Sequence, residues 1–100
     1  VTAVAAAGSA QGDAAALSLG ANVVSGADGT KGVILPTPVA GDVVEVYSSV
    51  ATNGLKIYPH SGGDINDGTG NAAVTIEGKT FSRFVAVDGT TWAAMFTANT

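Results

Sequence analysis

The stretch VVEVYSSVATNGLKIY, residues 43–58, decides the fold class. Residues 43–49 alternate valine with polar or aromatic residues, which is the period of a strand with one buried face. Residues 55–58 alternate in the same way, with Leu and Ile on one side of the chain. Between them lies Thr-Asn-Gly, residues 52–54, and Asn-Gly is typical of a tight turn between antiparallel strands. We therefore predict that the two strands form a β-hairpin.

Turn-forming residues also divide the chain on both sides of this stretch. Glycines and prolines divide the chain after residue 13 into short apolar segments rich in Val and Thr, a composition that favours strands joined by turns. No helical stretch of about 10–15 residues separates the segments, as parallel βαβ units would require. We therefore predict an all-β domain, a compact β-sandwich or β-barrel of about eight short antiparallel strands. The further strands are expected at Ala15–Leu19, Val23–Val24, Gly32–Leu35, Asn71–Glu77, Thr80–Val87 and Trp92–Thr97.

The first 13 residues differ from the rest of the chain. They are rich in Ala, Gly and Ser and show no strand period, and Gly8, Ser9 and Gly12 interrupt the alanine run that would otherwise favour a helix. We expect residues 1–13 to form an extended N-terminal arm, flexible or ordered only by a neighbouring molecule. Residues 14–100 are expected to form the β-domain.

The last predicted hairpin, residues 80–97, is apolar on both faces. Within each strand, bulky apolar side chains fall on alternate sides of the chain, so neither side is polar. Two explanations remain open: a bulge shifts the phase of a strand, or the second face is buried against another subunit. The candidate residues for such a subunit interface are Phe81, Phe84, Trp92, Met95 and Phe96.

The small size of the apolar core favours the second explanation. Of the 46 apolar residues in this 100-residue chain, 18 are alanine, which adds little buried area. A domain this short buries a modest fraction of its surface and needs a further source of stability. Because the chain has no cysteine and one histidine, disulfides and a structural zinc site are both implausible. Association with other copies is the source that remains.

Charge and hydropathy exclude two classes of partner. The formal net charge is −4, and the four basic residues are scattered along the chain, whereas phosphate binding needs clustered Lys and Arg. We therefore expect no nucleic acid partner. No apolar run approaches the ~18 residues of a transmembrane helix, so we expect no membrane partner either. The basic residues are Lys31, Lys56, Lys79 and Arg83.

His60 is the only side chain that titrates near neutral pH when unperturbed. Ser61 and Asp64 follow it closely, but three residues on one glycine-rich loop seldom reach the mutual geometry of a catalytic triad. We expect a solvated loop histidine, no catalytic residue and no enzymatic activity.

The run Asp64–Gly68 has some features of a calcium loop. It places Gly68 and Thr75 where an EF-hand needs a ligand and a glutamate, so that pattern fails and only an irregular calcium site stays open. The Asp-Gly-Thr triplets at 28–30, 67–69 and 88–90 are typical of turns and not of phosphate loops. We expect no cofactor and no metal.

Three motifs in succession resemble one family. They are GVILPTPVAGD at 32–42, LKIYPHSGGDIN at 55–66, and GTTW at 89–92, which Gly78-Lys79 and Phe84-Val85 precede. Over residues 14–97 the chain resembles small virion proteins of tailed bacteriophages, which occur as head-decoration proteins and as modules of head or tail fibres.

The resemblance implies an all-β fold, usually a homotrimer, on the outer capsid surface of a virion. The partner it implies is the major capsid protein, whose neighbouring subunits a decoration (cement) protein clamps and stabilises. A single module with an arm fits decoration better than a long fibre. The arm would order against the shell, with Val1, Thr2 and Val4 as candidate capsid contacts.

A second function stays open, that of a fibre or receptor-binding module that recognises carbohydrate on the host surface. Sugar sites commonly combine aromatic faces with hydrogen-bonding groups, and Tyr47, Tyr58 and Trp92 lie near polar loops in the sequence.

Overall fold

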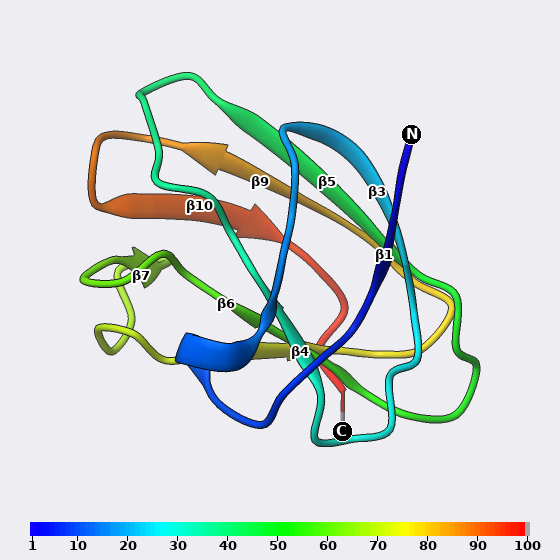
Figure 1. The fold of residues 1–100 in the computed structure, drawn as a ribbon. Coiled ribbons are helices and arrows are strands. Elements are labelled where there is room, and N and C mark those ends of the chain that lie inside the picture. Colours follow the sequence, from blue (N-terminus) through cyan, green and yellow to red (C-terminus); the bar gives the residue numbers. More distant parts are fainter. Residues whose placement is uncertain (100) are drawn as a thin grey trace.

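The computed structural model describes residues 1–99 as an all-β fold of two sheets, with the apolar core between them (Figure 1). The six-stranded sheet has the spatial order β1 (Thr2–Ala5), β3 (Gly20–Ser25), β5 (Val43–Ser48), β9 (Phe81–Ala86), β10 (Thr91–Met95) and β7 (Asp64–Ile65). The four-stranded sheet has the order β2 (Ala15–Ala16), β4 (Gly32–Ile34), β6 (Leu55–Tyr58) and β8 (Val74–Ile76). One short 3-10 helix, η1, covers Gln11–Asp13. Within residues 1–99, no helix is long and apolar enough to cross a membrane.

The first six strands alternate between the two sheets. As a result, β1, β3 and β5 pair in parallel in one sheet, and β2, β4 and β6 pair in parallel in the other. This arrangement resembles the coils of a solenoid. The all-β prediction is confirmed, but the prediction of an antiparallel sandwich or barrel is wrong. Parallel pairing had been excluded because no helices separate the strands, but a strand in a second sheet can also connect two parallel neighbours.

The predicted hairpin between residues 43–49 and 55–58 is also wrong. Both strands exist, but β5 belongs to the six-stranded sheet and β6 to the four-stranded sheet. The residues between them form a corner at which the chain changes sheets. The alternation is compatible with this corner, because valines of β5 and the Leu55 and Ile57 side chains of β6 point into the same core from opposite sides.

The predicted last hairpin is present. Strands β9 and β10 pair antiparallel in a continuous register from Trp92 opposite Ala86 to Met95 opposite Arg83. The turn between them is held by Asp88, whose carboxylate accepts hydrogen bonds from the backbone N–H groups of Thr90 and Thr91, both at 2.8 Å. The continuous register means that no bulge re-phases this pair.

The N-terminal 13 residues belong to the fold instead of forming an extended arm. Strand β1 pairs with β3 along its whole length. The chain then turns at Gly8, whose φ of +70° is one that residues other than glycine rarely adopt. The Asp13 carboxylate holds this turn by accepting hydrogen bonds from the N–H groups of Ser9 and Ala10, at 3.1 and 2.9 Å. The expectation of a flexible arm is therefore wrong: strand pairing and the turn at Gly8 order this stretch, although most of its side chains are exposed.

Strand β7 was not predicted, and its Ile65 belongs to the core, with 5% of its surface exposed. The strand pairs in parallel with β10. It is extended by the side chain of Asn66, which accepts a hydrogen bond from the Ala94 N–H at 2.7 Å and donates one to the Ala94 carbonyl at 3.3 Å. An amide side chain thus continues the pairing where the backbone of residue 66 turns into a left-handed conformation, at a φ of 56°.

All three Asp-Gly-Thr triplets lie at turns, as the sequence predicted; the turn at Asp67 is closed by the hydrogen bond from the Gly68 N–H to the Ile65 carbonyl, and those at Asp28 and Asp88 are held by their carboxylates. The Asp28 carboxylate accepts hydrogen bonds from the Thr30 hydroxyl, the Thr30 N–H and the Lys31 N–H. These bonds favour the ionised form and lower the pKa of Asp28 to about 2. Asp88 has a lowered pKa for the same reason, through its bonds from Thr91 and Thr90.

We predict that the Asp28 turn stays intact down to a pH at which ordinary carboxylates are protonated. Because the folded pKa lies below the unfolded one, the stabilisation is fully present above about pH 4 and is lost as the pH falls towards 2. A carboxyl carbon NMR titration of the wild-type protein should give Asp28 a midpoint near 2. The Thr30→Val variant, which lacks the strongest bond, should give a higher midpoint. An Asp28 midpoint near 4 in the wild type would contradict the prediction.

Candidate interaction surface

The outward side of the six-stranded sheet is the most unusual surface of this protein. Side chains alternate along each strand, so that one set enters the core and the other faces away from it. We call the second set the outer face. It consists of Ala3 and Ala5 on β1, Ala21, Val23 and Ser25 on β3, Val43, Glu45 and Tyr47 on β5, Phe81, Arg83 and Val85 on β9, and Ala93 and Met95 on β10.

The strand registers arrange these residues in rows across the sheet. One row runs from Val23 through Tyr47 to Phe81, because each is the pairing partner of the next. A second row joins Glu45, Arg83 and Met95 in the same way. Side chains directly opposite one another on neighbouring strands lie close enough to touch, so the outer face is one continuous patch.

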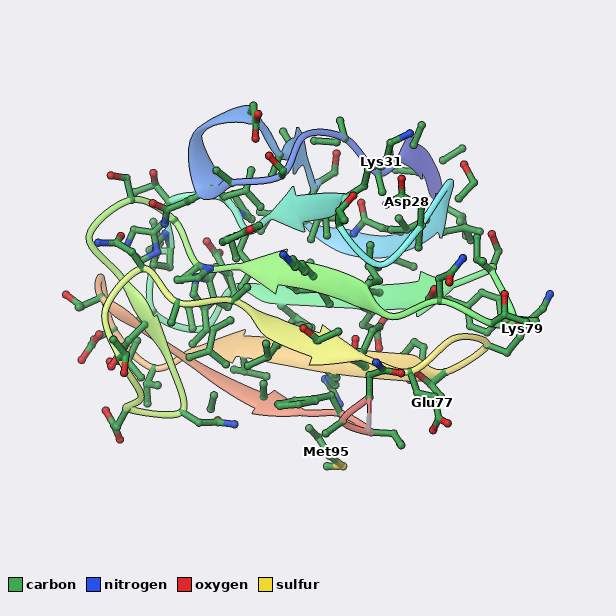
Figure 2. The ribbon with its side chains drawn as sticks, turned by 90° about the horizontal axis from the view of Figure 1, so that it is seen from below. Asp28, Lys31, Glu77, Lys79 and Met95 are labelled. Atoms are coloured by element: carbon green, nitrogen blue, oxygen red, sulfur yellow. The ribbon has the colours of Figure 1, made fainter. Side chains whose placement is uncertain are left out.

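The outer face is apolar where a solvated sheet would be polar. An antiparallel sheet with one side in water usually alternates apolar residues inward with polar residues outward. Here Phe81 is 56% exposed and Met95 79% exposed, and Val23 adds a further exposed apolar side chain. Met95 projects clear of the ribbon in Figure 2. Contiguous exposed apolar patches mark interaction sites on soluble proteins.

One ion pair crosses this apolar surface. The Nε of Arg83 lies 4.0 Å from Oε2 of Glu45, with 56% and 34% of the two side chains exposed. A pair at this distance and exposure stabilises a fold by about 0–1 kcal/mol at most. It therefore leaves both charged groups with capacity for a partner.

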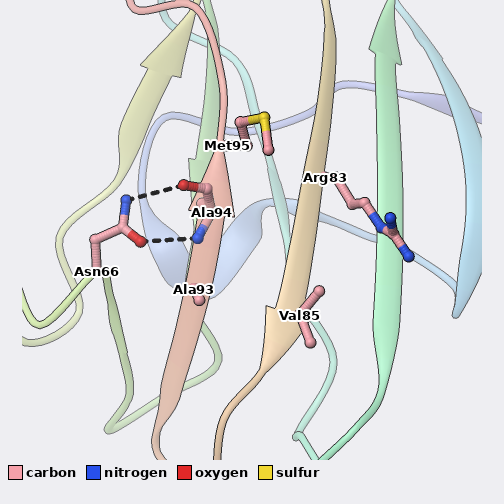
Figure 3. A pocket seen from close by; sticks show the side chains of 6 residues that line it. All are labelled: Asn66, Arg83, Val85, Ala93, Ala94 and Met95. Carbon is pink, nitrogen blue, oxygen red and sulfur yellow. Dashed lines mark hydrogen bonds between the residues drawn. The ribbon is translucent and has the colours of Figure 1, made fainter.

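Two hollows flank Met95 on the outer face. The first, of about 300 Å³, is lined by Asn66, Arg83, Val85, Ala93, Ala94 and Met95 (Figure 3). The second, of about 280 Å³, is lined by Phe81, Arg83, Met95, Phe96 and Thr97. Arg83 and Met95 border both hollows, so the surface alternates projecting side chains with recesses.

The opposite side of the molecule is different, because the N-terminal segment covers one end of the four-stranded sheet, around Tyr58. The Tyr58 hydroxyl lies 3.4 Å from the Ser9 carbonyl, to which it donates. The side-chain amide of Gln11 donates to the Pro59 carbonyl at 2.9 Å, and Ala7 exchanges backbone hydrogen bonds with Gly32. This cover reduces the exposure of Tyr58 to 9%. Among residues 1–99, no segment covers the outer face in this way.

The structure separates the predicted subunit-interface residues into two groups. Phe84 and Trp92 are fully buried in the core of the same chain, so they are unavailable to another subunit. Their placement follows from the alternation, which sends Phe84 and Ala86 inward when Phe81 and Val85 point outward. Phe81 and Met95 lie on the outer face, and the half-buried Phe96 lines the hollow beside them.

The predicted arm contacts lie on an edge strand. Val1 is 96% exposed, Thr2 is exposed, and Val4 is half buried and packs against the core. Their side chains therefore do not form one surface, because Val4 points into the fold.

His60 is buried, with 8% of its surface exposed, where a solvated side chain was expected. The loop closes around its ring so tightly that a Cβ at Gly63 would collide with the imidazole. Within residues 1–99, no hydrogen bond joins the His60 side chain to Ser61 or Asp64, and no group of three His, Asp or Glu side chains could hold a metal ion. His60, Ser61 and Asp64 therefore do not form a hydrogen-bonded triad in this structure.

Sequence reasoning missed the parts of the outer face that lie on β3 and β5. Val23, Val43 and Tyr47 complete the patch around Phe81 and Arg83. The alternation in residues 43–49 contained the relevant signal, since it placed valine at an outward position. The pairing of β5 with β9 was needed to bring this valine beside the last hairpin.

No protein-family model matches this chain, and no curated protein or solved structure is detectably similar to it.

We predict that Phe84→Ala lowers the free energy of unfolding by about 3–5 kcal/mol, because the side chain is fully buried and its removal leaves a cavity. Leu19→Ala, at a leucine that is 56% exposed and lies outside the outer face, should change it by about 0.5 kcal/mol. Urea unfolding followed by Trp92 fluorescence measures both. Equal, small losses would show that Phe84 lies outside the core.

Proposed function

We propose that this chain is a structural protein of a bacteriophage virion, a trimeric capsid decoration (cement) protein that binds the outer head surface and stabilises it. The observation that carries the proposal is the outer face, a largely apolar surface crossed by the Glu45–Arg83 pair. Among residues 1–99 no segment covers it as residues 7–13 cover Tyr58 on the other sheet. The resemblance of residues 14–97 to decoration and fibre modules supplies the biological setting.

The outer face fits contact with further copies of the chain. Apolar burial stabilises by about 25 cal/mol per Å², and the chain contains few large apolar residues for an internal core. The exposed Phe81 and Met95 would enter the recesses beside Arg83 on a neighbouring copy. Three copies arranged about an axis would turn these faces inward, as the resemblance to trimeric modules implies.

Attachment to a shell would stabilise the shell by mass action. A protein that binds the assembled capsid and not its separated subunits shifts the equilibrium towards assembly. No chemistry is required for this role, and rigid contact surfaces are sufficient.

The carbohydrate-binding alternative loses the aromatic platform that motivated it. Trp92 is fully buried and Tyr58 is 9% exposed beneath the N-terminal segment. Of the three aromatic residues, Tyr47 alone lies on the surface, where it is part of the outer face. Decoration is therefore the function that the geometry supports better.

We predict that the double variant Phe81→Glu/Met95→Glu is monomeric, because two carboxylates would have to be buried on the outer face. Light scattering at micromolar concentration should give the mass of three chains for the wild type and of one chain for the variant. Val39→Glu is the matched control, since Val39 is 70% exposed and lies outside the outer face, and this variant should remain a trimer. A monomeric wild type, or a trimeric double variant, would contradict the proposal.

We also predict where the protein lies on the virion. Negative-stain images of virions that lack the protein should lose regular knobs from the head, and added purified protein should restore them. Density lost from the tail instead of the head would assign the chain to a fibre.

A further inference from the structure

The corner between β5 and β6 contains the only Asn-Gly pair of the chain, at residues 53–54. The pair predicted a hairpin turn, but the chain passes here from the six-stranded sheet to the four-stranded sheet. The corner lies at the periphery of the fold (Figure 1), and Ala51, Thr52 and Asn53 are exposed. The Asn53 side chain is therefore outside any strand ladder and within reach of water.

The Asn53 side chain is also loosely held. Its Nδ2 donates to the Ala27 carbonyl at 3.4 Å, which is long for an N–H···O hydrogen bond. Within residues 1–99, this is the only hydrogen bond of the side chain, and the Gly54 N–H makes none. A rotation that brings Cγ of Asn53 to the Gly54 nitrogen therefore breaks one weak bond.

Three other asparagines are held more firmly. Asn22, Asn66 and Asn71 each have a side-chain amide fixed by at least two hydrogen bonds, at 2.7 to 3.3 Å. The residues that follow them are Val, Asp and Ala, whose side chains hinder the approach of a backbone nitrogen to Cγ. Glycine has no side chain and the widest choice of backbone conformations. Asn53 thus differs from these three in both respects.

We propose that Asn53 is a site of spontaneous deamidation, and that the isoaspartate formed there weakens the corner between β5 and β6. In the first step the Gly54 nitrogen loses its proton to base and attacks Cγ of Asn53. The new N–Cγ bond closes a five-membered succinimide ring. The Cγ–Nδ2 bond breaks, and Nδ2 takes a proton from water and leaves as ammonia. This chemistry depends on the chain alone and not on the proposed function.

Water then opens the succinimide ring in one of two ways. Addition to Cγ gives aspartate and restores the original backbone. Addition to the carbonyl carbon of residue 53 gives isoaspartate, in which the backbone runs through Cβ and Cγ and is one carbon longer. One water is consumed and one ammonia is released, without an oxidant or a reductant. Either product replaces the amide that donates to the Ala27 carbonyl with a carboxylate, which cannot donate when ionised.

The longer backbone of isoaspartate does not fit this corner. Gly54 is buried, and a Cβ placed on it would lie 2.7 Å from Cγ2 of Thr75 and 2.9 Å from Nδ2 of Asn99. The next residue, Leu55, is fully buried in the core. An additional backbone carbon at residue 53 therefore cannot be accommodated by moving Gly54 inward, and it strains the start of β6.

The test follows the masses of tryptic peptides from folded wild-type protein during storage at mildly alkaline pH. Cleavage after Lys31 and Lys56 gives residues 32–56, which contain Asn53 as their only asparagine, and residues 1–31, which contain only Asn22. Deamidation replaces NH2 by OH and so raises the mass of a peptide. We expect the heavier form of residues 32–56 to accumulate at least about tenfold faster than that of residues 1–31, where the reaction requires local unfolding.

Two variants at the exposed residue 53 serve as matched controls. Asn53→Gln keeps an amide but would have to close a less favourable six-membered ring, so its peptide should keep its mass. Asn53→Asp carries the charge of the product without the additional backbone carbon. In urea unfolding followed by Trp92 fluorescence, stored wild type should unfold at a lower urea concentration than fresh wild type. Fresh Asn53→Asp and stored Asn53→Gln should both unfold close to fresh wild type.

The outcomes decide the two parts of the proposal separately. A wild-type peptide of residues 32–56 that gains no mass, or gains it no faster than residues 1–31, would overturn the deamidation site. An equal gain in Asn53→Gln would do the same. Stored wild type that carries the heavier peptide, with isoaspartate identified by electron-transfer fragmentation, but unfolds like fresh protein would overturn the weakening of the corner.

Discussion

The parallel pairing of β1, β3 and β5 is the constraint on which the rest of the structure depends. A tight turn joins antiparallel strands only, so a chain that places neighbours in parallel must return to the starting end of the sheet each time. In this protein the return path is a strand of the second sheet. The apolar side of each returning strand then faces the strand it has left, and a core forms between two sheets without a helix.

The core changes in character where the pairing becomes antiparallel. The coils at the N-terminal end contribute small side chains such as Ala6, Val24 and Ala27, whereas the β9–β10 hairpin contributes Phe84 and Trp92. Burial stabilises in proportion to apolar area, so each of these two aromatic side chains contributes more than an alanine or a valine of the coils.

The sequence was sufficient for the fold class and for the sides of individual strands, but not for their partners. Alternation placed residues 43–49 and the last hairpin correctly, because side-chain period reports local geometry. Asn-Gly at 53–54 predicted a hairpin, but whether the next strand returns in the same sheet depends on contacts distant in sequence. The register pairs Thr2 with Asn22 and Gly20 with Val44, offsets of 20 and 24 residues, so the coils differ in length and give no fixed sequence period from which the parallel pairing could be predicted.

The same alternation accounts for both the predicted and the missed parts of the interaction surface. On hydrophobicity alone, all four of Phe81, Phe84, Trp92 and Met95 were predicted to lie at a subunit interface. The alternation of side chains along a strand instead sends Phe84 and Trp92 into the core and Phe81 and Met95 to the surface. A strand with apolar side chains on both faces is shielded from water only if both faces are covered. The four-stranded sheet covers the inward face. On the other sheet of the molecule, residues 7–13 fold back over Tyr58 and provide a second cover from within the chain. The outer face has no such segment among residues 1–99, and under the proposed function its apolar rows are the half of an interface that other chains complete.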